Sequence, residues 1–440
     1  MSKPLVAIIG RPNVGKSTLF NKLIGHRLSI IDDSPGVTRD RIYNECEWRS
    51  KTFMLVDTAG IEPKSNDTIL AQMKEQAEIA IENAKAIIFV VDFKSGVTAT
   101  DMDVASMLIK SKTPVILCVN KCDFLGEPPA EFYEFYNLGL GDPFAVSSVH
   151  GHGTGDLLDE VFKYISFEEK EVLEEDVIKV AIIGKPNVGK SSLINNMSGQ
   201  NRSIVSNIAG TTRDAIDITL ENEYGKFLMI DTAGIRRKSK VKESIEYYSV
   251  LRAWLAIDRA DVCIMMIDAL EGFSEQDSKI AGYAHEKGKG CIIAVNKWDA
   301  VDKNDKTMNE FEKKLAIDFG FISYAPFIFI SAKTGQRVNK LFELINKINA
   351  EYSSRVTTGK LNDMLSYATN KVQPPTDKGK RLKIYYMTQI STKPPTFVCF
   401  VNDRQLFHFS YQRYIENQIR ESFNLNHTPI KLVVRERPQK

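Results

Sequence analysis

One eight-residue loop occurs twice in the sequence, and this repeat restricts the possible folds more than any other feature. Each copy follows an apolar run and precedes a helical pattern, which predicts a strand, a phosphate-binding loop and a helix. The glycines allow backbone N–H groups to approach a phosphate, and the helix N-terminus favours its negative charge. The copies are Gly10-Arg11-Pro12-Asn13-Val14-Gly15-Lys16-Ser17 and Gly184-Lys185-Pro186-Asn187-Val188-Gly189-Lys190-Ser191, displaced by 184 − 10 = 174 residues.

The last two residues of each loop carry the chemistry that a nucleoside triphosphate needs. Lys16 and Lys190 supply ammonium groups that we expect to contact the β and γ phosphates. We expect the hydroxyls of Ser17 and Ser191 to ligate Mg²⁺. A glycine-rich turn before an ordinary helix is the alternative for a single loop, but two ordered copies argue against a coincidence.

Further motifs recur behind both loops in the same order. A carboxylate after a buried strand can hold Mg²⁺ through water, and the glycine N–H of the same motif can approach the γ-phosphate. The motifs are Asp57-Thr58-Ala59-Gly60 and Asp231-Thr232-Ala233-Gly234. Thr38 and Thr212 lie in glycine-containing loops, where a hydroxyl could close over the same metal. These segments therefore predict a switch that responds to loss of the γ-phosphate.

A third repeated motif predicts which base is bound. A carboxylate can accept both the N1–H and the N2 amino protons of guanine, a pair that adenine does not offer on that edge. The motifs are Asn120-Lys121-Cys122-Asp123 and Asn296-Lys297-Trp298-Asp299, followed by Ser147-Ser148-Val149 and Ser331-Ala332-Lys333. The segments 147–149 and 331–333 are each expected to present a backbone N–H to guanine O6. Because Val149 replaces the usual lysine, we expect weaker guanine affinity in the first site.

Length and spacing divide the chain into four parts. Alternating β-rich runs and helical patterns predict a mainly parallel sheet with helices on both faces in each of two α/β domains, residues 1–166 and 177–350. Residues 167–176 are rich in Glu and are expected to form an extended acidic linker, or for the first half the solvated face of a terminal helix. Residues 351–440 predict a small, basic α+β domain.

The composition excludes several classes of protein. The six cysteines show no C-x-x-C spacing, which predicts reduced core thiols and a reducing cytoplasm rather than disulfides or a zinc site. The longest apolar runs are no longer than a strand, so we expect no membrane span. We also expect the protein to be a monomer.

The last ninety residues carry a large share of the positive charge. They contain 15 Lys and Arg against 7 Asp and Glu, a net charge of +8, which leaves −6 for the rest of a chain whose total is +2. This charge beside Tyr385, Tyr386 and Tyr411 predicts RNA phosphates as a partner, with a solvated basic surface as the alternative. The opposite charges also predict that residues 351–440 pack on one of the two α/β domains. The basic segment 236–240 would repel them from the second α/β domain. We therefore expect the first domain to be its neighbour.

The ordered motifs resemble those of the Der (also called EngA) family of bacterial GTPases across essentially the whole chain. The resemblance implies two tandem Ras-like P-loop G domains and a C-terminal KH-like domain. It also implies GTP hydrolysis to GDP coupled to late assembly of the large (50S) ribosomal subunit, with that subunit or its precursor and rRNA as partners. A GTPase regulator of tRNA modification, another RNA-binding switch, and a non-hydrolysing scaffold are alternatives. KH domains ordinarily bind single-stranded RNA through a G-x-x-G loop. Gly359 and Gly379 are the only glycines after residue 350 and cannot form such a loop, so we do not expect sequence-specific binding of single-stranded RNA.

One departure from Ras-like enzymes concerns the catalytic cation. Ile61 and Ile235 stand where Ras-like enzymes carry the glutamine that orients water. Asn13 and Asn187 resemble the asparagine with which a subgroup of GTPases ligates K⁺ between the α and γ phosphates. Asparagine is also common in turns, which is the alternative explanation.

Overall fold

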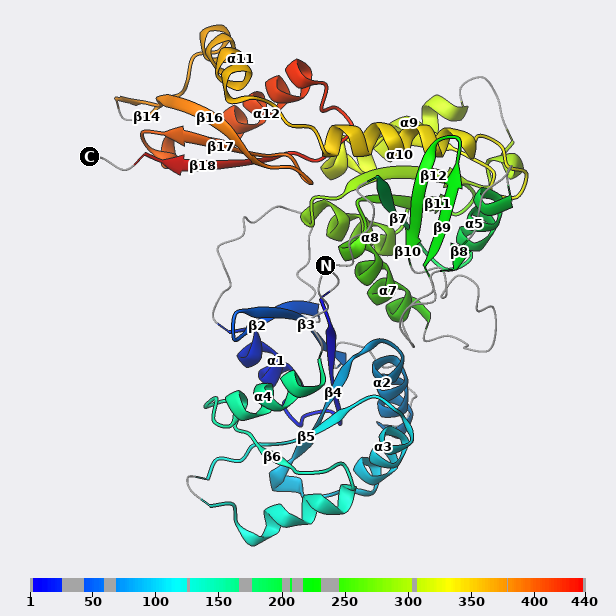
Figure 1. The fold of residues 1–440 in the computed structure, drawn as a ribbon, viewed down its shortest axis with the longest axis vertical. Coiled ribbons are helices and arrows are strands. Elements are labelled where there is room, and N and C mark those ends of the chain that lie inside the picture. The colour runs from blue at the N-terminus through cyan, green and yellow to red at the C-terminus, as the bar shows by residue number, and fades with distance from the viewer. Residues whose placement is uncertain are drawn as a thin grey trace. The chain divides into compact units, whose positions relative to one another are not determined.

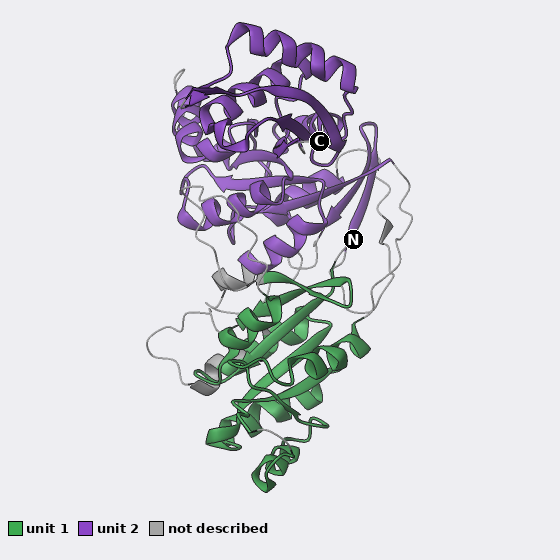
Figure 2. Cartoon of the chain, turned by 90° about the vertical axis from the view of Figure 1, so that its left-hand side faces the viewer, with its two compact units in different colours: residues 1–172 green, residues 173–440 purple. Residues whose placement is uncertain are grey.

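The computed structural model describes residues 3–25, 43–58, 69–124, 127–165, 176–199, 206–207, 217–230, 245–302, 307–377 and 379–437. Contacts between Cα atoms divide the chain into two compact units, residues 1–172 and 173–440 (Figure 2). The first unit holds one sheet with its helices, and the second holds a similar sheet followed by a smaller α+β domain (Figure 1). The predicted fold class is therefore confirmed.

The sheet of the first unit has the strand order β2-β3-β1-β4-β5-β6, in which only the β2–β3 pair is antiparallel. Its strands are β1 (Leu5–Gly10), β2 (Tyr43–Trp48), β3 (Lys51–Asp57), β4 (Ala86–Asp92), β5 (Val115–Asn120) and β6 (Phe144–Ala145). Its helices are α1 (Lys16–Ile24), α2 (Ile69–Asn83), α3 (Ala99–Lys110) and α4 (Thr154–Tyr164), with the short 3₁₀ segments η2 (Phe93–Ser95) and η3 (Ala130–Leu138).

Successive residues of the buried strands feed two different cores. Val6 and Ile8 of β1 pack with α1 and α4, whereas Ala7 and Ile9 pack with α2 and α3 (Figure 1). Side chains alternate between the two faces of a strand, so a strand that is buried on both faces needs apolar residues at every position. This explains why the central strands are continuous apolar runs.

The second unit begins with a sheet of the order β13-β12-β11-β7-β10-β9-β8. Its strands are β7 (Val177–Ile183), β8 (Ser206–Asn207), β9 (Ile218–Asn222), β10 (Gly225–Ile230), β11 (Val262–Asp268), β12 (Gly290–Asn296) and β13 (Phe327–Phe329). The helices are α5 (Lys190–Gly199), α7 (Ile245–Arg259), α8 (Glu275–Glu286), α9 (Thr307–Asp318) and α10 (Asn339–Tyr352), with η4 (Trp298–Ala300) and η5 (Gly320–Ile322). Helices α5 and α10 share one core with the strands.

The chain ends in a small domain around a three-stranded sheet of the order β16-β17-β18. Its elements are α11 (Thr358–Lys371), β14 (Thr376–Asp377), β15 (Lys380–Arg381), β16 (Ile384–Ser391), β17 (Thr396–Val401), η6 (Arg404–Leu406), α12 (Phe409–Phe423) and β18 (Lys431–Glu436). Helices α11 and α12 bury their apolar faces against the sheet. The end of the chain is thus a small α+β domain, as expected from the sequence.

The C-terminal domain packs on the second α/β domain. The charge argument from the sequence did not predict this contact. His427 donates its backbone N–H to Glu351 at 2.7 Å, and its ring Nδ1 lies 2.8 Å from the same carboxylate. The Arg420 guanidinium lies 5.6 Å from the centre of the Tyr324 ring, and Lys393 pairs with Asp261 at 3.6 Å. The expectation that the second domain would repel this one is thus wrong, because local pairs rather than net charge decide a contact.

The cysteines are core thiols, as their sequence context predicts. All six cysteines are buried and free, and burial raises the pKa of the Cys46 thiol to about 12 and that of Cys122 to about 11. Within the described residues, none of the helices is long and apolar enough to cross a bilayer.

Candidate nucleotide-binding sites

Each phosphate loop is closed by its own lysine. Lys16 Nζ donates to the carbonyls of Gly10 at 2.6 Å and Arg11 at 2.7 Å. Lys190 makes the same bond to Gly184 at 2.6 Å and also bonds the carbonyl of Lys185. Burial lowers the pKa of Lys16 to about 8, against the opposing attraction of Asp57. The ammonium is thus held against the loop whose backbone N–H groups are expected to bind an anion.

Asn120 and Asn296 join each phosphate loop to the loop that follows the last core strands. Their Nδ2 groups donate to Val14 O and Val188 O, both at 2.7 Å. Their Oδ1 atoms accept from the backbone N–H of Ser148 at 3.0 Å and of Ala332 at 2.8 Å. Three motifs that are far apart in the sequence are therefore brought together by one side chain in each domain.

The asparagines also explain the second glycine of each loop. Gly15 has a φ of +93°, and a Cβ there would lie 2.4 Å from Asn120 Nδ2. Gly189 has a φ of +102°, and a Cβ there would lie 2.3 Å from Asn296 Nδ2. Any side chain at either position would push the asparagine away, so the glycines are required by contact as well as by conformation.

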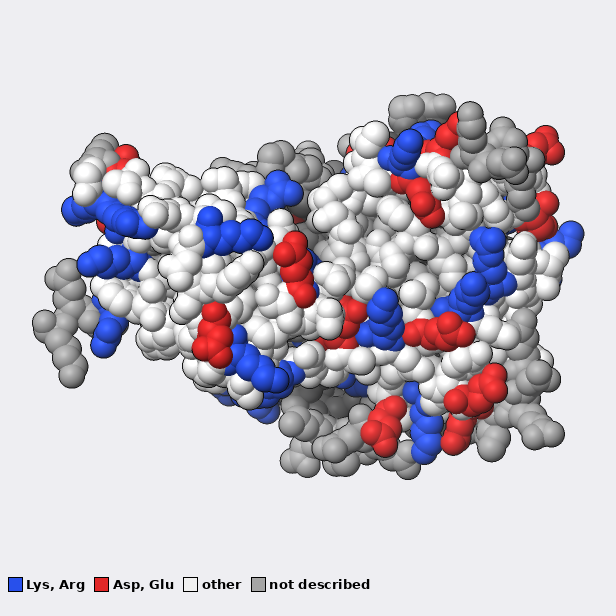
Figure 3. Space-filling model, turned by 90° about the horizontal axis from the view of Figure 1, so that it is seen from above, with Lys and Arg blue, Asp and Glu red and all other residues white. Residues whose placement is uncertain are grey.

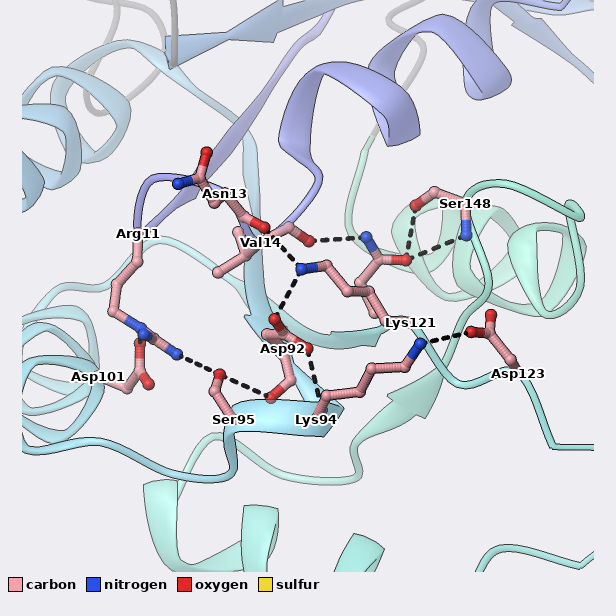
Figure 4. A network of polar contacts seen from close by, with 11 residues as sticks. Arg11, Asn13, Val14, Asp92, Lys94, Ser95, Asp101, Lys121, Asp123 and Ser148 are labelled. Carbon is pink, nitrogen blue, oxygen red and sulfur yellow. Dashed lines mark hydrogen bonds and ion pairs between the residues drawn. The ribbon is translucent and has the colours of Figure 1, made fainter.

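The lysine of the base motif forms a second bridge to the phosphate loop. Lys121 Nζ donates to Asn13 O and to Asp92 Oδ2, each at 2.7 Å (Figure 4). In the second domain Lys297 pairs with Asp268. Asp92 and Asp268 end the central strands β4 and β11, where a carboxylate lies at the carboxyl edge of the parallel sheet. Ligands of open α/β sheets bind at this edge.

An oxygen pair in the first domain fits a hard divalent cation. Ser17 Oγ donates to Asp57 Oδ2 at 2.7 Å, which joins the end of the phosphate loop to the end of β3. Hydroxyl and carboxylate oxygens are the ligands that Mg²⁺ takes, usually together with several waters. The residues present therefore fit this metal.

The second residue of each phosphate loop is tethered to a buried carboxylate. Arg11 Nε donates to Asp101 Oδ1 at 2.9 Å, and Lys185 Nζ lies 3.4 Å from Asp277 Oδ2. Both carboxylates are also the third residue of a helix and accept from its N-cap, Thr98 in α3 and Ser274 in α8. The two aspartates thus fix the phosphate loop to the start of a helix.

Asp123 faces the solvent between two donors of the first domain. Ser147 Oγ donates to its Oδ1 at 2.9 Å, and Lys94 Nζ donates to its Oδ2 at 3.0 Å. The hydrogen bond from Lys94 and then that from Ser147 lower the pKa of this carboxyl. In Figure 4 one of its oxygens faces the Lys94 ammonium, and the side chain is 42% exposed, so a planar ligand could reach it from the solvent.

Several predicted site residues lie outside the described residues. They are Thr38, Ala59, Gly60 and Ile61 of the first copy, and Thr212, Asp231, Thr232, Ala233, Gly234 and Ile235 of the second. The expected linker 167–176 also lies outside them apart from Asp176. Among the described residues, Thr58 Oγ1 donates to Ile8 O at 2.7 Å, which holds the end of β3 on β1.

Sequence reasoning missed three pairs of residues in these sites. They are Asp92 and Asp268, Thr98 and Ser274, and Asp101 and Asp277. A signal was present, because each pair is displaced by 176 residues, as are Asn120 and Asn296. The spacing T-x-x-D or S-x-x-D is moreover that of a helix-capping box.

Comparison with known proteins gives matches along the whole chain. Residues 5–121 and 179–297 match the family model described as "50S ribosome-binding GTPase". Residues 355–435 match the model described as "KH-domain-like of EngA bacterial GTPase enzymes, C-terminal".

Full-length relatives agree with these matches. A protein named GTPase Der from Acetivibrio thermocellus is 62% identical over 437 residues, which cover 99% of each chain. The GTPase Der of Ruminiclostridium cellulolyticum is 61% identical over the same length, again covering 99% of each chain. That of Lachnospira eligens is 58% identical over 440 residues, covering all of both chains.

Proposed function

The chain belongs to the Der family of GTPases, and on that premise we propose that it is a nucleotide-controlled assembly factor of the large ribosomal subunit with one GTP site in each G domain. One observation carries the assignment of two sites. Asn120 and Asn296 make the same pair of hydrogen bonds, from the phosphate loop to the base loop, in both domains. Among the described residues, both domains therefore have the hydrogen bonds that connect the phosphate loop with the base loop.

Within each site we assign the roles by the chemistry of the side chains. Lys16 and Lys190 neutralise charge on the β and γ phosphates, where developing negative charge is best stabilised by a fixed cation. Asp123 and Asp299 accept the N1–H and N2 protons of guanine, and the base loops at residues 147–149 and 331–333, which Asn120 and Asn296 hold in place, offer a backbone N–H to its O6.

The metal ligands are proposed on the same basis. Ser17 with Ser191, and Thr38 with Thr212, would hold Mg²⁺, while Asp57 and Asp231 would contact it through water. The metal supplies charge stabilisation at the phosphoryl oxygens that are transferred and released. Ser17 and Asp57 contribute by fixing each other's oxygens at 2.7 Å.

A monovalent cation is proposed for the position that an arginine finger fills in other GTPases. Asn13 and Asn187 adopt left-handed backbone conformations, with φ of 66° and 64°. Among the described residues none hydrogen-bonds the Asn13 side-chain amide, and Figure 4 shows it directed away from the Lys121 bridge. Its carbonyl oxygen is therefore available to ligate K⁺ beside the phosphates.

The C-terminal domain is proposed to contact ribosomal RNA. Lys380, Arg381 and Lys383 are exposed along the start of its sheet, and blue side chains recur over this domain at the left of Figure 3. Arg437 lies 5.4 Å from the centre of the exposed Tyr385 ring, a pairing that can both stack on a base and contact a phosphate. We propose that bound nucleotide sets the arrangement of the domains and hence whether the protein docks.

Sedimentation with ribosomal particles tests this function. We expect the protein to move with large subunits or their precursors in the presence of a non-hydrolysable GTP analogue and to dissociate with GDP. Equal association in both nucleotides, or binding to tRNA in place of the large subunit, would support the alternative of a regulator of tRNA modification or another RNA-binding switch.

A further inference from the structure

The Lys94–Asp123 ion pair has no evident structural purpose. The side chain of Lys94 is 64% exposed and that of Asp123 is 42% exposed, so the pair lies in water. Exposed ion pairs contribute little to stability because solvent screens them and two side chains lose freedom. The pair does, however, place an ammonium group on the carboxylate to which the proposed function assigns the guanine base.

The hydrogen-bonding capacity of Asp123 leaves room for both partners. An ionised carboxylate has about four acceptor positions, two on each oxygen. Ser147 occupies one on Oδ1, and Lys94 occupies one on Oδ2. One position remains on each oxygen, which is what the N1–H and N2–H donors of guanine require. Lys94 therefore has no need to leave when a base binds.

The position of Lys94 has an exact counterpart in the second domain. The backbone N–H of Lys94 donates to Asp92 Oδ1, and that of Leu270 donates to Asp268 Oδ1, both at 2.9 Å. The two residues thus follow the same turn at the end of the same strand. The second domain carries an aliphatic side chain, 62% exposed, where the first carries a lysine.

In the base loops, residues 147–149 and 331–333, the lysine is in the second domain and the aliphatic residue is in the first. Val149 and Lys333 follow Ser148 and Ala332, whose N–H groups donate to the Oδ1 atoms of Asn120 and Asn296. Val149 is 72% exposed. Each site therefore has one lysine and one exposed aliphatic residue at the same two positions, but the two are exchanged between the domains.

We propose that Lys94 is a guanine-site residue of the first G domain, supplying from the η2 turn the lysine that the second domain supplies as Lys333. The inference rests on the proposed assignment of guanine to Asp123. The long aliphatic stem of a lysine covers apolar surface while its ammonium stays in water, so either position can serve one edge of a bound base. Lys94 then compensates for the lysine that Val149 replaces in the base loop of the first domain.

The test measures binding of fluorescently labelled GDP to the full chain carrying Lys190→Ala and Asp299→Ala, so that only the first site is read. We expect Lys94→Met to weaken binding about threefold at low salt, the size of an exposed ion pair beside the ligand, and less at high salt. Lys163→Met is the matched control, because Lys163 is 66% exposed and also pairs with a carboxylate, that of Glu160. It should leave the affinity unchanged.

A rescue variant separates a role in the site from a general charge effect. Adding Val149→Lys to Lys94→Met recreates the arrangement of the second domain, and we expect it to restore most of the lost affinity. Unchanged or tighter binding by Lys94→Met would overturn the inference. So would an equal gain from Val149→Lys whether or not Lys94 is present.

One more variant distinguishes this inference from the function on which it rests. Asp123→Asn should move the first site from guanine to xanthine diphosphate. If it does and Lys94→Met has no effect, the inference fails while the guanine site stands. If Asp123→Asn does not change the base preference, Asp123 is not the base ligand and both fail. Thermal unfolding of each variant shows that it is folded.

Discussion

Arg11 in the first phosphate loop donates its Nε to Asp101, ninety residues later, at 2.9 Å. The Asp101 side chain has no exposed surface, and its other oxygen accepts from the backbone N–H and the hydroxyl of Thr98. One carboxylate thus caps helix α3 and holds the loop that we assign to the phosphates. Lys185 and Asp277 repeat the relationship in the second domain at 3.4 Å.

Asp101→Asn should loosen the first phosphate loop. The amide keeps the shape but removes the charge that satisfies a half-buried guanidinium, so we expect a loss of about 1–3 kcal/mol in the free energy of unfolding of the first unit. The KM for GTP at that site should rise because the loop is less well ordered. Denaturant titration and kinetics in a Lys190→Ala background measure the two effects.

The second domain and a surface pair provide the comparisons. Burial raises the pKa of Asp277, and its Oδ1 has no hydrogen-bond partner among the described residues, so Asp277→Asn should cost less than Asp101→Asn. Glu275→Gln breaks an exposed pair with Lys279 and should change neither quantity. Equal effects of all three variants would contradict a specific tether.

The contact between the second G domain and the C-terminal domain should weaken in acid. His285 Nδ1 lies 3.4 Å from the Tyr324 hydroxyl, and burial, together with the charge of Arg420 of α12, lowers its pKa below the ordinary value of 6.5. The unfolded chain therefore binds more protons below about pH 6.5, and stability falls as the pH falls through that value. Neutral imidazole is the form that the folded chain prefers.

Replacing His285 tests this linkage. His285→Gln cannot titrate, so its melting temperature should fall less than that of the unmodified chain between pH 7.5 and pH 5.5 in scanning calorimetry. His150→Gln, at an exposed position, should behave like the unmodified chain. A pH dependence that His285→Gln leaves intact would assign the effect to other groups.

Asp299→Asn should transfer the second site toward xanthine nucleotides. Xanthine O2 accepts a hydrogen bond where guanine N2 donates one, and an asparagine amide can donate to it. Losing two bonds to a charged acceptor at about 1.5 kcal/mol each weakens GTP binding by roughly 100-fold. Competition between GTP and XTP in a Lys16→Ala background measures the preference, and an unchanged preference would remove Asp299 from the base site.

Replacing K⁺ by Na⁺ at equal ionic strength should slow GTP turnover markedly. The reason is that the proposed ligands, Asn13 and Asn187, would hold the larger ion beside the phosphates. Asn13→Ala combined with Asn187→Ala should erase the difference between the salts. Equal rates of the unmodified protein in K⁺ and Na⁺ would leave the catalytic cation unidentified.

The sequence could predict those parts of the site in which one residue type has one chemical role. The phosphate loops, the base motifs and the strands that precede them are found where expected, because glycine spacing and apolar runs are local properties. The α+β character of the C-terminal domain was predictable too, since α11 and α12 each present one apolar face at helical spacing.

The sequence could not predict contacts between side chains far apart in the chain. Arg11 and Asp101 meet only because β1 and β4 are neighbours in the sheet, and nothing in either segment alone indicates a partner. The contact of the C-terminal domain with the second G domain was not predicted, for a related reason. Net charge is an average over a domain, whereas Glu351 and His427 decide the contact locally.

Single-site inactivation tests most directly the central claim that the chain has two complete GTP sites. Lys16 and Lys190 close their loops through the same bonds, so Lys16→Ala and Lys190→Ala should each remove the turnover of one site and leave that of the other. Steady-state phosphate release with saturating GTP should therefore persist in both single variants and vanish only in the double variant. Loss of all hydrolysis in either single variant would show that the other domain is regulatory rather than catalytic.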